Sequence, residues 1–372
     1  MTVDTDAATA ATMQSFLDQM QSSGRAVFAL GYPNQRAVVD AIPTGAPSLD
    51  VALGVGGLPR GRVVELYGLE SSGKTSLALS TIAQAQKLGM PAAFVDAEHA
   101  LSASHATAYG VDLNQLAFYQ PDHGEDALEM TREMARSGAF PIIVIDSVAA
   151  LIPRAELEGS VEDLQVGAQA RMMSKGLRML SGEARRTDTT IVFINQIRQQ
   201  IGVRMGNPNV TPGGKALKFF SSVRLEVFSA AGDRIYPGGK KTEPPVGQDI
   251  RVKVVKNKVA PPMRRAEFRI YYNSGVDVGS SVLEAGKELG LLVQRGASVS
   301  EVATDQRLAV GKDNFAKLLA DDPQLCDRLV EQIHATLRGD VSGLAEEALP
   351  TDDEVPAAPD GADVDDEELA VG

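Results

Sequence analysis

Cysteine is nearly absent from this chain of 372 residues: Cys326 is the only one, so no internal disulfide framework can form. No group of histidine and cysteine residues has the spacing of a zinc site. No apolar run approaches the roughly 18 residues that a membrane-spanning helix needs. Residues 1–12 carry Asp4 and Asp6 where a signal peptide would carry positive charge. These absences predict a cytoplasmic protein in which Cys326 is a core or surface filler of a helical segment.

Basic residues are absent from the end of the chain. Twelve of the 49 acidic residues lie from Asp340 onward, where there is no Lys or Arg. The formal net charge of −13 therefore divides into an acidic tail and a nearly neutral body, with 36 basic and 37 acidic residues in 1–339. The tail is poor in large apolar residues, which predicts disorder. It is either a solubilising appendage or an electrostatic competitor for the protein's own basic surface.

One stretch has the full pattern of a nucleoside-triphosphate site, G-x-x-x-x-G-K-[ST]. Its residues are Gly68, Leu69, Glu70, Ser71, Ser72, Gly73, Lys74 and Thr75. Glycines let backbone N–H groups converge on phosphate oxygens, Lys74 supplies charge for the β- and γ-phosphates, and the Thr75 hydroxyl is a ligand for Mg²⁺. A strand is predicted before the loop at 62–67 and a helix after it at 76–85. This order of strand, loop and helix predicts a site for a triphosphate with Mg²⁺.

Three further buried strands, predicted at 91–96, 141–147 and 190–196, end in polar side chains or are followed by them. Ligands of open α/β sheets bind at the carboxyl ends of strands. Glu98 is placed there to reach the γ-phosphate and deprotonate an attacking water, with a plain surface carboxylate as the alternative. Asp146 ends a strand like the one that holds magnesium in phosphate-loop ATPases. Gln196 is the candidate γ-phosphate sensor, because the segment after it has the composition of a mobile loop.

Two basic elements flank the same predicted end of the sheet. The segment 197–218 has no acid, many glycines and prolines, and four basic residues: Arg198, Arg204, Lys215 and Lys218. A loop of this length is usually functional or disordered, and its charge and glycine amides suit phosphodiester binding. A loop is also predicted at 158–167, followed by a helix with Arg171, Lys175 and Arg178 on one face. One basic helix face is ordinarily just solvated, but two such elements together favour nucleic acid.

The remaining segments indicate smaller parts around this core. Residues 251–258 alternate charged and apolar side chains, which predicts an edge or half-buried strand, and 266–272 is its antiparallel neighbour. Beyond Gly275 the pattern becomes helical, including 281–291 and 313–319, so a domain boundary is expected near 275. A weak helix and a strand are predicted within 13–31, as either an arm that packs on another subunit or a stabilising extension.

Taken together, these residues resemble the bacterial RecA recombinases, the ATP-dependent enzymes of DNA strand exchange. The resemblance runs from about Gly45 to Gly275, and more loosely to about Arg338. It rests on nine pieces of sequence: 48–50 (SLD), 56–59 (GGLP), 70–75 (ESSGKT), 96–101 (DAEHAL), 145–151 (IDSVAAL), 170–174 (ARMMS), 193–198 (FINQIR), 213–219 (GGKALKF) and 254–258 (VVKNK).

The resemblance implies an α/β fold: a RecA-type phosphate-loop core at 36–275, with a central, mostly parallel sheet flanked by helices. It further implies a polymerisation arm at 1–35, a small α/β C-terminal domain at 276–338 and a disordered acidic tail at 339–372. The expected activity is ATP hydrolysis in a helical filament on single-stranded DNA, with homologous pairing and strand exchange in recombinational repair and the SOS response. Duplex DNA and a LexA-type repressor are the further expected partners.

Residue roles also follow from the resemblance. Glu98 is the catalytic base, Lys74 and Thr75 hold phosphate and Mg²⁺, Asp146 is the acid of the magnesium strand, and Gln196 links the γ-phosphate to DNA. Other residues act at subunit interfaces, where ATP lies: Lys256 and Lys258 reach the neighbour's ATP, Lys218 and Phe219 lie beside them, and Tyr272 covers the adenine. DNA is expected to be lined by the loops at 158–167 and 197–213 with Arg171, Ser174, Arg178, Arg198, Gly213 and Gly214.

The sequence departs from the family pattern at a few positions. Ser102 and His105 stand where an adenine-contacting Asp and Tyr are usual, and His105 can still stack on a base. Met205 replaces an aromatic and Val166 a methionine in the two DNA loops, while 297–300 lacks an expected aromatic cluster. These departures leave room for a divergent paralogue with weakened exchange. Two further alternatives stay open: a hexameric motor such as a helicase, and a regulatory ATP-binding protein that does not use DNA.

Overall fold

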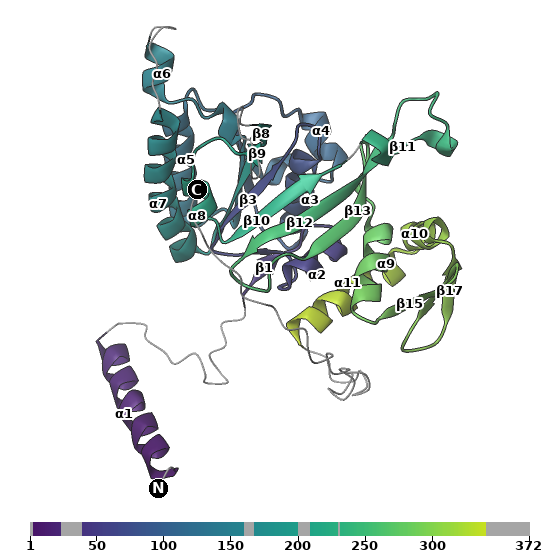
Figure 1. Ribbon diagram of the computed structural model, residues 1–372, viewed down its shortest axis with the longest axis horizontal. Helices are drawn as coiled ribbons and strands as arrows, with labels where there is room; N and C mark the ends of the chain where they lie inside the picture. The colour runs from purple at the N-terminus through teal and green to yellow at the C-terminus, as the bar shows by residue number, and fades with distance from the viewer. Residues whose placement is uncertain (1–2, 24–38, 160–166, 200–208, 230, 340–372) are drawn as a thin grey trace, which may run out of the picture. The chain divides into compact units, whose positions relative to one another are not determined.

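The computed structural model describes residues 3–23, 39–159, 167–199, 209–229 and 231–339 (Figure 1). The strand expected at 26–30, the departures at Val166 and Met205, and the acidic tail lie outside these ranges. The helix expected from residue 13 is α1, Val3–Ser22. None of the described helices combines the length and apolar character needed to cross a bilayer.

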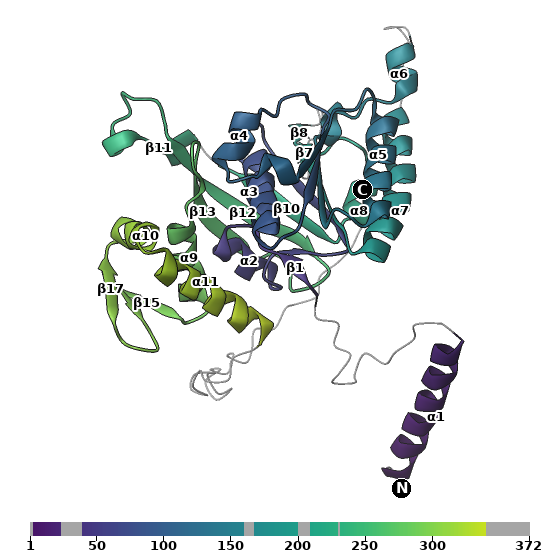
Figure 2. The same cartoon turned by 180° about the vertical axis from the view of Figure 1, so that it is seen from behind.

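A large mixed sheet forms the centre of the protein (Figures 1 and 2). Its parallel part has the order β10 (Val223–Phe228), β3 (Val63–Gly68), β7 (Thr190–Gln196), β6 (Ile142–Asp146), β4 (Ala92–Asp96) and β5 (Leu116–Tyr119). Beyond β10 the sheet continues antiparallel through β12 (Gly247–Asn257), β13 (Arg265–Tyr271) and β14 (Gly275–Val276), and β11 (Arg234–Ile235) also pairs with β12. The predicted α/β class with a mostly parallel central sheet is confirmed.

The strand predicted around 251–258 is half-buried but is not an edge. β12 lies between β10 and β13, and its side chains alternate between buried and partly exposed positions along most of its length. The expected antiparallel pairing with the following strand is confirmed, with Ile250 opposite Phe268. The basic side chains of β12 gave the appearance of an edge because they lie on the more exposed face.

Helices cover both faces of the sheet, which explains the unbroken apolar strands. Along β6, Ile142 and Val144 join a core with α2 (Pro47–Leu53), α3 (Lys74–Lys87) and α4 (Ala103–Ala108). Ile143 and Ile145 join the opposite core with α5 (Gly124–Ser137), α7 (Ala168–Thr187) and α8 (Ala216–Phe220). Figures 1 and 2 show α5 and α7 side by side on this second face.

Short elements connect these layers. They are β1 (Ala41–Ile42) paired with β2 (Leu58–Pro59), η2 (Leu113–Gln115), η3 (Val148–Ala150), α6 (Arg154–Glu158), β8 (Arg198–Gln199) paired with β9 (Asn209–Val210), η4 (Ala231–Asp233) and η5 (Pro237–Gly239). Two of them lie next to the site: η3 directly follows β6, and β8 directly follows β7. The chain therefore runs directly from the polar ends of β6 and β7 into η3 and β8.

The carboxyl-terminal part builds its own small core. It contains α9 (Val278–Glu288), a three-stranded antiparallel sheet of β15 (Leu292–Arg295), β16 (Ser298–Glu301) and β17 (Arg307–Val310), and then α10 (Lys312–Asp321) and α11 (Pro323–Arg338). Val51 of α2 joins this core. Polar contacts tie it to α2 as well, since the Ser48 N–H donates to Ser281 Oγ at 2.9 Å. Cys326 is half-buried in α11, against this core.

Candidate nucleotide and nucleic-acid site

The phosphate-loop pattern lies where β3 ends at Gly68 and α3 begins at Lys74. Gly73 has a positive φ of 90°, and a Cβ there would lie 2.9 Å from Ile250 Cδ1. A Cβ at Gly68 would lie 2.0 Å from the Val227 carbonyl oxygen. The loop therefore requires glycine at both positions because it passes tightly against β10 and β12. Gln248 of β12 also donates a hydrogen bond to the Ser71 carbonyl at 3.2 Å.

Lys74 is buried at the base of this loop, with 7% of its surface exposed. Its Nζ donates to the carbonyl oxygens of Gly68 at 3.2 Å and Leu69 at 2.6 Å. Burial lowers the pKa of Lys74, and the carboxylates of Asp146, Glu98 and Glu70 oppose that effect. The result is a desolvated cation held at the start of a helix, which suits an anionic ligand.

Thr75 and Asp146 meet across the end of the sheet. The Thr75 hydroxyl donates to Asp146 Oδ2 at 2.7 Å. The pKa of Asp146 is raised to about 6, chiefly by burial and also by the carboxylates of Glu98 and Asp96, which outweigh the Thr75 hydrogen bond and the charge of Lys74. A hydroxyl and a carboxylate are oxygen donors of the kind that Mg²⁺ prefers, and a bound cation would favour the ionised carboxylate. These two residues fit a magnesium site.

Glu98 lies beside Asp146 and is oriented by hydrogen bonds. Its backbone N–H donates to the Asp146 carbonyl at 3.1 Å. Its side-chain Oε1 accepts hydrogen bonds from the Ser147 hydroxyl and from Gln196 Nε2, the latter at 3.0 Å. Ser147 carried no functional prediction, although its place directly after Asp146 was a usable signal. The structure thus brings together the phosphate loop and three predicted polar residues, Glu98, Asp146 and Gln196.

The two departures from the adenine pattern lie on one short helix. Ser102 is the N-cap of α4, since its Oγ accepts from the His105 N–H at 3.2 Å. The His105 ring packs edge-to-face on Tyr109 with 5.2 Å between centroids. Tyr272 directly follows β13. There Tyr271 pairs with Gly247, at the same end of the sheet as the phosphate loop of its own chain. Contact of Tyr272 with adenine across a subunit interface stays a prediction.

Lys256 and Lys258 lie at the other end of the sheet from the phosphate loop of their own chain. The register places Lys256 opposite Arg224, and Arg224 beside Glu65, three residues before Gly68. Lys256 and Gly68 are therefore separated by about 10 Å along the strands and by about 10 Å across them. Lys256 Nζ instead donates to the carbonyl oxygens of Lys218 at 2.6 Å and Phe219 at 3.1 Å, at the end of α8. Burial lowers the pKa of Lys256 most, and the positive charges of Lys258 and Arg224 also lower it.

The predicted DNA-lining residues gather around α7. Arg171, Ser174 and Arg178 line one open hollow with Lys175, and the Ser174 hydroxyl donates to the Ala170 carbonyl at 2.8 Å. A Cβ at Gly214 would lie 2.9 Å from Ala170 Cβ. The Gly213 N–H donates to Gln169 Oε1 at 3.2 Å, and Gln169 Nε2 donates in turn to the carbonyls of Val148 and Leu151. The described end of the basic segment therefore rests on α7 and η3, while Arg198 lies on β8, paired with Val210 of β9.

Comparison of the sequence with known families shows to which family the chain belongs. The profile of the RecA N-terminal domain matches residues 11–277, which is more than half of the chain. The chain belongs to the RecA family. It is therefore a nucleotide-binding, DNA-dependent ATPase of recombination, and DNA binding and self-association are general properties of the group.

RecA relatives cover most of the chain. "Protein RecA" of Symbiobacterium thermophilum is 50% identical over 313 residues, covering 84% of this chain and 87% of that protein. "Protein RecA" of Saccharopolyspora erythraea is 51% identical over 302 residues, covering 81% and 85%. A crystal structure of the RadB recombinase matches more distantly, with a TM-score of 0.48 and 22% identity over 63% of this chain and 98% of that one.

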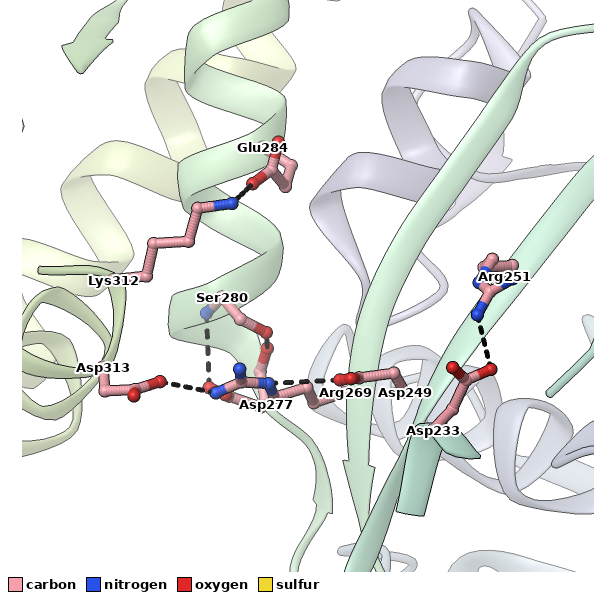
Figure 3. Close-up of polar contacts among 9 residues, drawn as sticks. All are labelled: Asp233, Asp249, Arg251, Arg269, Asp277, Ser280, Glu284, Lys312 and Asp313. Atoms are coloured by element: carbon pink, nitrogen blue, oxygen red, sulfur yellow. Dashed lines mark hydrogen bonds and ion pairs between the residues drawn. The ribbon is translucent and has the colours of Figure 1, made fainter. Parts of the chain in front are cut away.

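This RecA-family chain also has a polar cavity of about 220 Å³ between β12, β13, α9 and α10. Figure 3 shows that charged side chains around it are paired with one another. Arg269 binds Asp249 at 3.1 Å and Asp313 at 2.7 Å, and Lys312 binds Glu284 at 2.9 Å. The pair of Arg269 and Asp313 joins α10 to the sheet, and the pair of Lys312 and Glu284 joins α10 to α9, so these charges hold the elements around the cavity together.

Proposed function

We propose that this RecA-family protein polymerises on single-stranded DNA into a helical filament and hydrolyses ATP between its subunits. The filament pairs homologous DNA and exchanges strands. One observation carries the proposal: the phosphate loop and the pair Lys256 and Lys258 lie at opposite ends of one sheet. Within one chain the strand register keeps the lysines away from the loop, whereas two chains stacked head to tail would bring both to one triphosphate.

Hydrolysis in this arrangement uses Glu98 as the general base. Glu98 accepts a proton from water as the water oxygen bonds to the γ-phosphorus, and the bond from that phosphorus to the ADP oxygen breaks. Lys74, together with Lys256 and Lys258 of the next subunit, stabilises the charge that spreads over the phosphoryl oxygens. Thr75 and Asp146 would hold Mg²⁺, which neutralises phosphate charge when bound. Gln196 is hydrogen-bonded to Glu98. It senses whether the γ-phosphate is present and transmits this to the basic segment that follows Gln196.

The remaining contacts are assigned by position. Ser102, His105 and Tyr272 bind the adenine end of ATP, while the backbone of 68–73 and the side chains of Lys74 and Thr75 bind its phosphates. DNA contacts come from α7 and the basic segment: Arg171, Ser174, Arg178, Arg198, Gly213 and Gly214. Residues 1–35 serve polymerisation, 276–338 admit duplex DNA and 339–372 restrain it. Promotion of LexA-type repressor self-cleavage in the cytoplasm completes the proposal.

A mixing experiment tests the shared site. Lys74→Ala removes the loop cation, and the double change Lys256→Ala with Lys258→Ala removes the lysines, so each variant alone should hydrolyse ATP poorly. In a one-to-one mixture on single-stranded DNA, about one quarter of wild-type turnover should return, because about one junction in four joins an intact loop to intact lysines. Turnover no greater than the sum of the separate variants would refute the shared site.

Electron microscopy separates the alternatives. Open helical filaments on single-stranded DNA with a non-hydrolysable ATP analogue are expected. Closed rings that unwind duplex would favour a hexameric motor. ATP turnover that is unchanged by DNA would favour a regulatory ATP-binding protein. Near-wild-type turnover in dilute, DNA-free monomer would contradict a site formed between subunits.

A further inference from the structure

A carboxylate and an amide meet inside the sheet, on the neighbouring strands β3 and β7. Glu65 and Asn195 are both fully buried, with 0% exposure. Glu65 Oε1 accepts a hydrogen bond from Asn195 Nδ2 at 3.0 Å. A buried carboxylate is unfavourable unless its oxygens are paired, so its partners indicate what it does.

Asn195 uses both ends of its amide to hold the surroundings of Gln196. Its Nδ2 donates a second hydrogen bond to the Pro212 carbonyl at 3.2 Å. Its Oδ1 accepts from the Gln196 N–H at 2.9 Å, and the Gln196 side chain donates to Glu98. Asn195 thus joins the residue that contacts the proposed base to the end of the basic segment.

The other oxygen of Glu65 points toward the lysine end of the sheet. Glu65 Oε2 accepts from Arg224 Nε at 2.5 Å, and the Arg224 guanidinium lies 4.5 Å from the centre of the Tyr67 ring. Arg224 pairs in register with Lys256 on β12. Hydrogen bonds therefore connect Arg224 through Glu65 and Asn195 to the Pro212 carbonyl, and Arg224 lies on the strand next to the one that carries Lys256.

We propose that Glu65 and Asn195 are positioning residues that couple nucleotide binding to DNA binding. An ionised carboxylate only accepts hydrogen bonds, so Glu65 forces the NH₂ of Asn195 to face it and leaves the amide oxygen for the Gln196 N–H. This fixed orientation makes Gln196 and Pro212 move as one unit. The inference rests on the proposed roles of Glu98 and Gln196, which neither residue replaces.

Two single variants and their combination test the pair. Asn195→Asp places a carboxylate against both Glu65 and the Pro212 carbonyl, where all three groups are acceptors. Glu65→Gln keeps the shape but no longer specifies which way the Asn195 amide points. The double variant, Glu65→Gln with Asn195→Asp, restores one donor, one acceptor and the buried charge between positions 65 and 195. It still leaves the Pro212 carbonyl facing an acceptor.

The coupling is measured as the ratio of single-stranded DNA dissociation constants with ADP and with a non-hydrolysable ATP analogue. This ratio should fall in all three variants, and in Asn195→Asp and the double variant it should fall roughly tenfold, which is the effect of losing one hydrogen bond. The double variant should recover the melting temperature that Asn195→Asp loses, and ATP affinity without DNA should stay within about twofold of wild type. Asn314→Asp is the matched control: it removes an exposed hydrogen bond on α10, from Asn314 Nδ2 to the Val310 carbonyl at 2.6 Å, and should leave the ratio unaltered.

Recovery of both stability and coupling in the double variant would overturn the inference, because the pair would then be merely structural. An unchanged ratio in Glu65→Gln and the double variant would overturn it too, and these two suffice if Asn195→Asp does not fold. Wild-type protein without nucleotide-dependent DNA affinity would instead refute the proposed function. The two failures are therefore distinguishable.

Discussion

Asp146 gives a prediction whose size follows from its surroundings. Burial raises its pKa from an ordinary 3.8 to about 6. Between these pH values the native state binds more protons than the unfolded state, so stability falls as pH rises. Above about pH 6 the buried carboxylate is ionised, and it lowers the free energy of unfolding by its full amount. A shift of about two pK units corresponds to about 3 kcal/mol of unfolding free energy.

Asp146→Asn should remove this cost. An amide is neutral at every pH, and its carbonyl oxygen can still accept the Thr75 hydrogen bond that Asp146 now accepts. Without Mg²⁺ and nucleotide, the variant should melt several degrees above wild type at pH 8, and the difference should shrink toward pH 5. Turnover should be lost, because the amide supplies no charge for a magnesium ion.

Thermal unfolding followed by circular dichroism from pH 5 to 8 in chelator checks this prediction. Asp321→Asn, at an exposed position, is the matched control and should follow the wild-type curve. An Asp146→Asn protein that is less stable than wild type at pH 8 would refute the reasoning. It would mean that the carboxylate stabilises the fold through Thr75 and Lys74 by more than burial costs.

Three further changes test individual residues and the tail. Lys74→Ala should abolish nucleotide binding or turnover, measured with a fluorescent ATP analogue and a phosphate-release assay. Glu98→Gln should bind ATP but hydrolyse it roughly 10² to 10⁴ times more slowly, leaving long-lived filaments, and unchanged turnover would remove Glu98 from the role of base. Deleting 340–372 should tighten DNA binding and shift its salt dependence, because a tethered polyanion competes with phosphates; identical binding curves would reduce the tail to a solubility device.

The nucleotide end of the site was predictable because its signals are local. The phosphate loop fixes its own geometry through Gly68, Gly73 and Lys74. Glu98, Asp146 and Gln196 could be brought together on paper because parallel strands end at one edge of a sheet. Their convergence in the structure follows from that rule and needs no knowledge of strand order.

Strand order is what the sequence did not reveal. The contact between Glu65 and Asn195 depends on β3 and β7 being neighbours, and nothing in either segment specifies its neighbour. β10 was missed although Val223, Leu225 and Val227 alternate as a half-buried strand does. The short strands β15, β16 and β17 are too brief and mixed in polarity to give a clear period.

Separating the loop and the lysines onto two ends of each subunit has a consequence for any stack of copies. One terminal copy presents a loop with no lysines above it, and the copy at the far terminus presents lysines with no triphosphate below. The two tips of such a polymer would be chemically unlike, so hydrolysis would affect growth and shrinkage differently at each tip. Short polymers would also hydrolyse less ATP per subunit, because the number of complete sites is always one fewer than the number of subunits.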